Sequence, residues 1–340
     1  MLRNLLTDIA GVSVGNVTDL TLGSGVTAIV FDRPAIASGS VLGGAPGGRD
    51  TALLDPSMTV ETVDAFVLSG GSAFGLDAAG GVQAGLRKIG RGLQVGTTRV
   101  PIVPQAILMD LLNGGDKDWG LHSPYRDMGY EAFQAASTGD FALGTIGAGT
   151  GATTVNLKGG LGSASARTAS GHTIAAIVAV NALGSATIGS GPHFWAAPFE
   201  QDGEFGGLGL PQKFPPADIA MRVKGMTVTA TTIGAVVTDA TLTKAQVHRL
   251  SITAHDGLAR ALLPAHMPSD GDTVFAAATC EKPVSDDRQL FFELCHLATL
   301  VMARAIARGV YHATALPAPG SQPAWRDRFA DQPGIDKKKT

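Results

Sequence analysis

The clearest secondary-structure signal in this 340-residue chain is Thr227-Val228-Thr229-Ala230-Thr231-Thr232-Ile233-Gly234-Ala235-Val236-Val237-Thr238-Asp239. Thr, Val and Ile dominate it, and such residues favour strands. We therefore predict a buried strand over 226–238. The preceding segment, 198–225, is rich in Gly and Pro, which predicts irregular structure. After the strand, Thr243 and Gln246 have the spacing of a capping box, which predicts the start of a helix.

Strand-like and helix-like runs alternate along the rest of the chain. Ser72 is predicted to be the N-cap of a helix that runs to Lys88 and is closed by Gly90. A last helix is predicted from Ser285 to Arg308, with Gly309 as its stop. Alternation of this kind predicts a layered α/β protein, without choosing between a doubly wound sheet and a sandwich. The other predicted elements are strands over 25–31, 65–68, 172–180 and 274–278 and a helix over 243–262.

The junction between Ala230 and Thr231 has the features of an internal cleavage site. Ala230 is small and would leave its carbonyl open to the Thr231 hydroxyl, and the loose segment before it would let the new ends separate. The freed α-amine would have a pKa near 8, which suits a base at neutral pH. From these residues alone, a plain strand threonine is the favoured interpretation, and Thr229 and Thr232 are rival nucleophiles.

A series of short motifs follows in a specific order. They are Gly11-Val12-Ser13-Val14-Gly15-Asn16, Gly43-Gly44-Ala45-Pro46-Gly47-Gly48-Arg49-Asp50, Leu68-Ser69-Gly70-Gly71-Ser72-Ala73-Phe74-Gly75-Leu76, Gly147-Ala148-Gly149-Thr150-Gly151, Asn156-Leu157-Lys158-Gly159-Gly160, Ala179-Val180-Asn181, Ala230-Thr231-Thr232-Ile233 and His266-Met267-Pro268-Ser269-Asp270-Gly271-Asp272-Thr273. With these motifs the chain resembles the β-peptidyl aminopeptidase and nylon-oligomer hydrolase family, or L-aminopeptidase/D-esterase, from about Thr7 to Ala315.

The resemblance implies a fold and an activity. The fold would be a four-layer αββα sandwich like that of N-terminal-nucleophile hydrolases, formed by one domain over 1–316, with a loose tail over 317–340. The precursor would cut itself into fragments 1–230 and 231–340. The new N-terminal threonine would then hydrolyse amides through an acyl-enzyme.

The resemblance also implies roles for individual residues. Thr231 matches the autocatalytic nucleophile, and Lys158 a lysine that assists proton transfer and orients it. Asn181 matches the asparagine whose amide helps to hold the oxyanion. Asp270 and Asp272 resemble two aspartates close to the nucleophile in the nylon-hydrolase branch.

The residues themselves leave other interpretations open. Lys158 lies between an apolar residue and a Gly pair, which indicates partial burial and a lowered pKa. Asn181 follows an apolar run, where a structural amide is the favoured interpretation, with an oxyanion donor as the alternative. Asp270-Gly271-Asp272 fits a turn and a carboxylate pair equally well.

Substrate identity is left open within one class, short peptides or peptide-like amides with a free amine. β-Amino acid peptides, N-terminal residues of small peptides and 6-aminohexanoate (nylon) oligomers all fit. The chain departs from the nylon branch by having Ala230 where that branch has asparagine, and by lacking a tyrosine in 106–110. An acyltransferase of the ornithine acetyltransferase type and a non-catalytic oligomeric member are the alternatives.

Composition predicts a globular cytoplasmic protein. Charged residues make up 16%, against about 25% in an average domain, and there are 45 glycines. This favours closely packed layers in a homo-oligomer, and the resemblance implies a tetramer. The net charge of −3 without a basic block excludes a nucleic-acid footprint. The apolar runs 174–180 and 297–303 are too short to span a membrane.

No cofactor or metal is predicted. Gly147-x-Gly149-x-Gly151 lacks the helix and acidic residue of a dinucleotide site. The eight histidines have no zinc-protease spacing, and the two cysteines make no disulfide framework.

Overall fold

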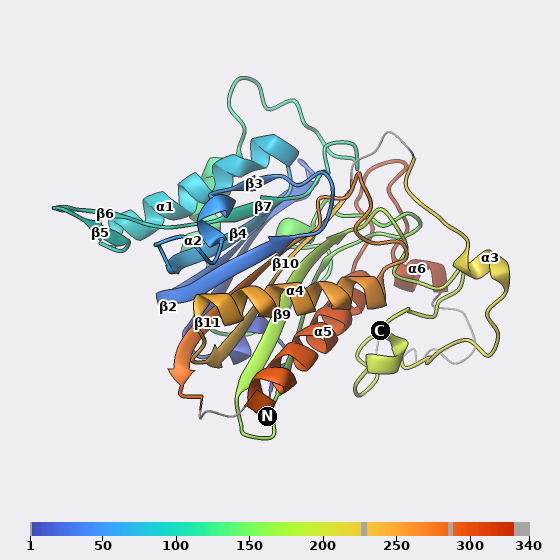
Figure 1. Ribbon diagram of the computed structural model, residues 1–340. Coiled ribbons are helices and arrows are strands. Elements are labelled where there is room, and N and C mark those ends of the chain that lie inside the picture. The colour runs from blue at the N-terminus through green and yellow to red at the C-terminus, as the bar shows by residue number, and fades with distance from the viewer. Residues whose placement is uncertain (1, 226–229, 285–287, 330–340) are drawn as a thin grey trace.

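The computed structural model describes residues 2–225, 230–284 and 288–329, and shows mixed strands flanked by helices (Figure 1). The strands are β1 (Val12–Asp19), β2 (Ser24–Val41), β3 (Gly48–Arg49), β4 (Thr62–Ser69), β5 (Leu93–Val95), β6 (Thr98–Val100), β7 (Gln105–Ile107), β8 (Leu161–Arg167), β9 (Thr173–Asn181), β10 (Thr231–Ala240) and β11 (Thr273–Lys282). The α-helices are α1 (Ala78–Lys88), α2 (Tyr125–Gln134), α3 (Pro216–Ile219), α4 (Lys244–Ala261), α5 (Arg288–Tyr311) and α6 (Trp325–Phe329).

The long strand β2 joins two halves of the sheet system. Its first part pairs with β1 on one side and β4 on the other, and its last residues, 36–41, pair with β11. The register with β4 shifts between Val30 and Ala35, where the strand is irregular. The order of paired strands over the described residues is β3-β7-β4-β2-β11-β10-β9-β8. Among the strands that the structure describes, only β10 with β11 and β4 with β7 run parallel.

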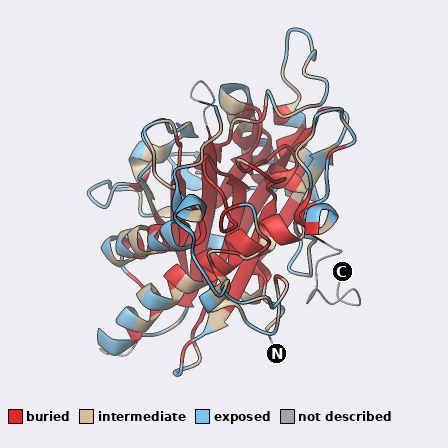
Figure 2. Cartoon of the chain, turned by 90° about the vertical axis from the view of Figure 1, so that its right-hand side faces the viewer, coloured by how far each residue is buried: buried red, intermediate tan, exposed pale blue. Residues whose placement is uncertain are grey.

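Three apolar layers separate four layers of secondary structure. Alternate residues of β2 and β4 point either to α1 and α2 or to the facing strands, as expected for the two-residue period of a strand. Ile29 and Phe66 lie between the two halves with Ile177 and Ile233, whereas Val178 faces α4 and α5. The buried strands fill the centre of the molecule (Figure 2). The fold is therefore an αββα sandwich, as the resemblance implied.

The strand and helix around the candidate junction form as predicted. β10 runs from Thr231 to Ala240, and every residue in it is buried. Residues 226–229 of the predicted strand lie outside the described residues. Thr243 Oγ1 accepts a hydrogen bond from the Gln246 backbone amide, and Gln246 Oε1 accepts one from the Thr243 backbone amide, so the predicted capping box is confirmed. β11 extends to Lys282, beyond the predicted Ala278.

The prediction for Ser72 is wrong. A 3-10 helix covers Ser72–Asp77, α1 begins only at Ala78, and Ser72 has a left-handed φ of 50°. The tight turn is held by tertiary contacts. The Gly71 amide donates to Asp110 Oδ1 at 2.7 Å, and a side chain on Gly71 would collide with the Tyr125 ring.

The predicted stop at Gly309 is also wrong, because α5 continues to Tyr311. Gly309 serves close packing instead. A Cβ at this position would lie 3.0 Å from Gly160 O and from Gly162 N, beside β8. The glycines let helix and strand approach closely, a role that sequence spacing does not distinguish from a C-cap. The predicted start at Ser285 lies outside the described residues.

The expected loose tail differs from the structure over 317–329. Trp325, in α6, is fully buried and packs with Phe194 and Tyr311 in the core under α5. The Pro323 carbonyl also accepts a hydrogen bond from the Lys158 amide at 2.8 Å. An aromatic pair within a short Pro-rich and charged segment anchors it to the domain.

Within the described residues, α5 is the one helix whose length and apolar composition would let it cross a membrane, with a mean hydropathy of 1.6 over 18 residues. The 297–303 run, which is by itself too short to span a membrane, lies within this helix. Of that window, 61% is buried inside the protein, where α5 packs on α4, β8 and β9. Such burial is typical of a core helix.

Candidate functional site

Thr231 lies at the sheet edge where β10 begins. It pairs with Asn181, the last residue of the antiparallel strand β9, and is 4% exposed. Ala230, just before the strand, forms a parallel bridge with Asp270. The β10–β11 pairing then sets Ile233 beside Thr273. The register therefore brings Thr231, Asn181 and the Asp270 loop together, although they are far apart in sequence.

The carbonyl of Ala230 receives two hydrogen bonds. Thr231 Oγ1 donates to Ala230 O at 2.6 Å, and the Gly271 amide donates to the same oxygen at 2.9 Å. The Ala230 amide donates to Ser269 O at 3.3 Å, which fixes the residue from the other side. The junction thus has a hydroxyl next to a carbonyl that a backbone N–H already polarises.

The loop that supplies Gly271 is held by the Gly43-Gly44-Ala45 motif. The Ala45 amide donates to Asp270 O at 2.7 Å, and the Gly43 amide donates to Asp272 O at 3.3 Å. A Cβ on Gly43 would lie 2.4 Å from Asp270 O. This glycine motif is therefore a backbone support for the loop next to the junction.

The two aspartates have different environments. Asp272 Oδ1 accepts the Thr232 amide at 2.9 Å, and Oδ2 accepts the His266 amide and Nδ1 at 3.0 and 2.8 Å. Asp270 Oδ2 accepts the Met267 amide at 2.9 Å, whereas its buried Oδ1 has no hydrogen bond of normal geometry to any described residue. Burial and the Asp272 charge raise the pKa of Asp270 to about 6.

His266 is a neighbour that sequence reasoning did not select. Burial lowers its pKa, but the hydrogen bond and charge of Asp272 outweigh burial, so the pKa of His266 is raised. The ring stacks edge-on against His255, with centroids 4.9 Å apart. Burial lowers the pKa of His255 to about 4. A signal was present in the sequence, because His266 opens the motif that contains both aspartates.

The Asn181 side chain is buried and central. Its Oδ1 accepts the Thr153 amide at 3.0 Å, Lys224 Nζ at 2.9 Å and Asn113 Nδ2 at 3.3 Å. Its Nδ2 donates to Met109 O at 2.9 Å. Since an NH₂ group has two donors, one amide hydrogen has no acceptor among the described residues.

Lys158 is buried, as its position beside the Gly pair predicted, with 1% exposure. Its ammonium donates to the carbonyls of Gly149, Ala152 and Gly159 at 3.0, 2.8 and 2.9 Å. Burial lowers the pKa of Lys158 to about 7. No hydrogen bond joins Lys158 to Thr231 among the described residues, so the structure does not place the lysine on the hydroxyl.

Lys224 is a second amine that sequence reasoning missed. Burial lowers its pKa to about 7, against the opposing effect of the Asp270 charge. The signal was the one used for Lys158, because Val223-Lys224-Gly225 also sets a lysine between an apolar residue and a glycine. It was overlooked inside a segment predicted to be irregular.

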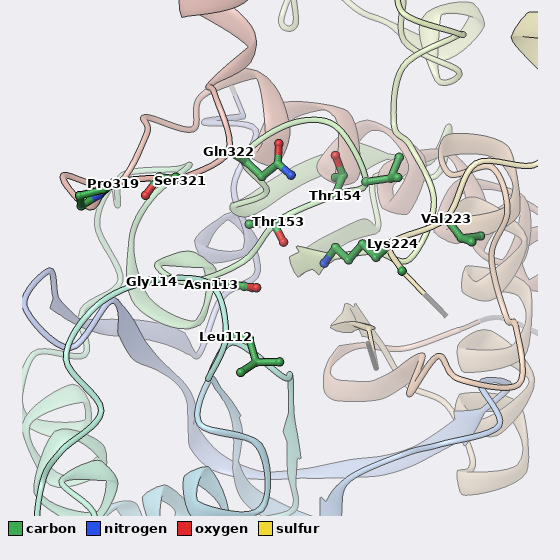
Figure 3. Close-up of a pocket in the computed structure, with 13 residues that line it drawn as sticks. Leu112, Asn113, Gly114, Thr153, Thr154, Val223, Lys224, Pro319, Ser321 and Gln322 are labelled. Carbon is green, nitrogen blue, oxygen red and sulfur yellow. The ribbon is translucent and has the colours of Figure 1, made fainter. Parts of the chain in front are cut away.

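A cavity of about 490 Å³ is lined by Lys224 and Asn113, which both donate hydrogen bonds to Asn181 Oδ1. Lys224 reaches into it from one side, with Asn113 and Ser321 on the other sides (Figure 3). We call it the Lys224 cavity. Its lining comprises Leu112, Asn113, Gly114, Thr153, Thr154, Val155, Val223, Lys224, Gly225, Pro319, Gly320, Ser321 and Gln322.

The site holds amines, amides and two carboxylates without a metal-like arrangement. In the part of the chain that the structure describes, no three His, Cys, Asp or Glu side chains gather as potential ligands. The arrangement can activate a hydroxyl, hold a carbonyl oxygen and move protons through Asp270 or a lysine.

Several proteins are similar to this chain, some in sequence and others in fold. An uncharacterized aminopeptidase of Mycobacterium tuberculosis (strain ATCC 25618 / H37Rv) is 39% identical, over 96% of this chain and 98% of the relative. One of Mycobacterium leprae is 40% identical, over 81% and 78%. A Burkholderia beta-aminopeptidase structure superposes with a TM-score of 0.70 at 20% identity, covering 96% and 92%.

The L-aminopeptidase D-Ala-esterase/amidase of Ochrobactrum anthropi, described as a variant of the Ntn hydrolase fold, superposes with a TM-score of 0.68 at 19% identity, over 96% of this chain and 91% of that chain. The sequence pattern of Peptidase family S58 matches residues 4–322. The sandwich fold is the fold of these relatives of known structure. The chain is an amide hydrolase that belongs to peptidase family S58.

Proposed function

We propose that this chain is a precursor that cuts itself between Ala230 and Thr231, and that the new N-terminal Thr231 hydrolyses amide bonds of short peptide-like substrates. The observation that carries the proposal is the pair of hydrogen bonds on Ala230 O, from Thr231 Oγ1 at 2.6 Å and Gly271 N at 2.9 Å. A neighbouring hydroxyl and an oxyanion donor are what an intramolecular acyl shift requires.

Self-cleavage proceeds by transfer of the Ala230 acyl group. Thr231 Oγ1 attacks the Ala230 carbonyl carbon, its proton passes to a base, and the Gly271 amide holds the negative oxygen. The C–N bond then breaks, the nitrogen takes a proton, and an ester links Ala230 to the Thr231 oxygen. Water hydrolyses this ester and leaves a free amine on Thr231 and a carboxylate on Ala230.

Asp270 is the base that the surroundings favour for the first step. Its loop pairs with Ala230, its Oδ1 has no hydrogen bond of normal geometry among the described residues, and its pKa near 6 leaves it mostly ionised at neutral pH. Asp272 has a different role, since both of its oxygens are occupied. It fixes the Thr232 amide and thereby the start of β10.

In the mature enzyme the Thr231 amine takes the hydroxyl proton, because a free α-amine has a pKa near 8. Thr231 Oγ1 attacks the substrate carbonyl, and water later releases the acyl group. The free hydrogen on Asn181 Nδ2 supplies an oxyanion donor across the strand pair. Lys158 acts without bonding to the hydroxyl. Its buried charge stabilises negative charge near Asn181, and its lowered pKa suits proton transfer.

The substrate class proposed is short amides with a free amine, namely β-amino acid peptides, N-terminal residues of small peptides or 6-aminohexanoate oligomers. Names of relatives that contain aminopeptidase support the free amine. We also propose a cytoplasmic homo-oligomer, a tetramer, because the chain has few charges and many glycines.

The test of self-cleavage is an intact-mass spectrum of denatured protein. Fragments 1–230 and 231–340 support the proposal, and one uncut, fully active chain refutes it.

A further inference from the structure

The Lys224 cavity carries a single ionisable group. Lys224 is the only charged residue in its lining, and no carboxylate forms an ion pair with it among the described residues. Among the described residues its ammonium donates only to Asn181, to Oδ1 at 2.9 Å and O at 3.5 Å. The Asp270 charge acts on Lys224 without a direct ion pair. A half-buried cation without a direct ion-pair partner is unfavourable, and an anion in the cavity would relieve that cost.

Other groups in the lining can donate hydrogen bonds to the same anion. The Gln322 amide and the Thr153 hydroxyl form no hydrogen bond with described residues, and both side chains lie around the cavity with Lys224 (Figure 3). A cationic ammonium with neutral donors suits a carboxylate. An ammonium group would be repelled, so this cavity does not fit the free amine of a substrate.

Lys224 is held independently of the junction. Its amide donates to Leu183 O at 3.0 Å, and the Arg222 side chain bonds to the Gly189 carbonyl just before it. Neither contact involves the residues next to Ala230. Cleavage between Ala230 and Thr231 therefore leaves Lys224 on its own anchors in the cavity wall.

One residue, Asn181, connects the cavity to the nucleophile. Asn181 pairs with Thr231 across the β9–β10 ladder, and the Asn181 side chain holds Lys224. Directly opposed residues in such a ladder have Cα atoms about 5 Å apart. A carboxylate bound by Lys224 would therefore belong to the part of the substrate nearest the bond that is cut.

The direction of the substrate follows from its chemistry. In the proposed function the acyl part begins with a free amine, so a terminal carboxylate can only lie on the leaving part. A carboxylate close to the cut bond then belongs to a leaving group of one residue. The volume of about 490 Å³ is within the range of small-molecule pockets and accommodates one amino acid.

We propose that the Lys224 cavity binds the free α-carboxylate of a single leaving amino acid, so that this enzyme favours dipeptide-like substrates over the corresponding peptide amides. The inference rests on the proposed function, because it uses Thr231 as the nucleophile. It adds the identity of the leaving group and names Lys224 as the residue that determines this preference.

The experiment compares a dipeptide such as β-alanyl-alanine with its C-terminal amide on cleaved enzyme. A charged hydrogen bond contributes roughly 1.5–3 kcal/mol, so the wild type should prefer the acid about ten- to a hundredfold in kcat/KM, mainly through KM. In Lys224→Gln the preference should fall to about one, and Lys224→Arg should restore part of it. Lys213→Gln, an exposed lysine of the same segment, is the matched control and should keep the full preference.

Three results would each overturn the proposal. The first is equal kcat/KM of the wild type for acid and amide. The second is a Lys224→Gln enzyme that keeps the preference. The third is a stronger gain from an aspartyl side chain in the leaving residue than from its α-carboxylate. Intact mass of every variant reports cleavage separately. NMR titration of uncleaved Thr231→Ala with alanine and alaninamide tests carboxylate binding even if no hydrolysis occurs, so failure of the proposed function is distinguishable.

Discussion

Gly271 and Thr231 approach so closely that no side chain fits between them. A Cβ on Gly271 would lie 2.7 Å from Thr231 Oγ1 and 2.8 Å from Ala45 O. The same glycine donates its amide to Ala230 O at 2.9 Å. The backbone at Gly271 is therefore both the donor for the junction carbonyl and the wall against which the hydroxyl is packed.

Gly271→Ala should block or strongly slow self-cleavage, because the methyl group must displace either the Thr231 hydroxyl or the Asp270–Asp272 loop. Loss of one oxyanion donor alone typically lowers a rate by about 10²–10³-fold. The measurement is the fraction of uncut chain by intact mass over time. Gly225→Ala, where a Cβ meets nothing within 4 Å, is the control and should cut normally. Normal cutting of Gly271→Ala would argue against this geometry.

Three threonine variants identify the nucleophile. Thr231→Ala should stay uncut, and Thr231→Ser should cut, because a serine hydroxyl can make the same attack. Thr232→Val should also cut, since Thr232 Oγ1 is buried without a partner among the described residues and takes no part in the junction. Mass spectrometry with N-terminal sequencing checks all three, and a new N-terminus at residue 232 would move the nucleophile to Thr232.

Some elements of the fold could be predicted from the sequence and others could not. β10 and the capped start of α4 were predictable because their signals are local, a β-branched run and the Thr243–Gln246 spacing. Gly309 and Ser72 were misassigned because their roles depend on tertiary contacts. Gly309 packs against β8, and the turn that carries Ser72 is held by the Asp110 side chain. Local spacing contains no information on such contacts.

The site shows the same division. Lys158 and the aspartate pair were selected through a resemblance of motifs, yet only the β9–β10 register shows that Asn181 is opposite Thr231. His266 and Lys224 were missed because their importance comes from a carboxylate and an amide that fold against them. Their sequence neighbours gave weak signals that became interpretable only after the loops were placed.

Asn181→Ala should lower kcat of the cleaved enzyme by about 10²–10³-fold if its NH₂ holds the oxyanion. It should also lower stability, because the Thr153 amide and the Lys224 ammonium lose their acceptor. Buried donors left unpaired cost about 1–3 kcal/mol each. Urea unfolding and steady-state kinetics separate the two effects. A variant with lower stability but near-normal kcat would restrict Asn181 to a structural role.

Lys158→Met should destabilise the precursor, because three buried carbonyls lose their common donor. The expected loss is several kcal/mol, from about 1–3 kcal/mol per unpaired group. Lys282→Met is the comparison. The Lys282 side chain is partly exposed and bonds to Gly171 O and Asp239, so this variant should lose far less stability. A kcat that falls in Lys158→Met while the chain remains folded and cut would support its place in proton transfer.

The pH dependence of self-cleavage should report Asp270. As the proposed base, Asp270 must be ionised, and burial with the Asp272 charge raises its pKa to about 6. The cleavage rate of precursor diluted from urea should therefore rise about tenfold per pH unit below pH 6 and level off above it. Asp270→Asn should remove this midpoint and most of the rate, as measured by acid-quenched samples on a denaturing gel.

The pKa shift of Asp270 also affects stability, with the opposite trend. A carboxyl group with a raised pKa binds its proton more tightly in the folded than in the unfolded state, so its contribution to stability falls as pH rises from about 4 to 6. His266, whose pKa is raised by Asp272, likewise stabilises the fold at low pH and loses this contribution as pH rises through its folded pKa. The Asp270 charge also acts on Lys224, whose pKa is about 7. Lys224→Gln therefore separates the contribution of Lys224 to the pH dependence of stability from that of Asp270.

Urea unfolding of uncleaved Thr231→Ala between pH 4 and 7 should show the decline in stability, and Asp270→Asn in that background should flatten it. If the decline persists unchanged in Asp270→Asn, the raised carboxyl pKa belongs elsewhere, and the base for cleavage must be sought among His266 and the two buried lysines.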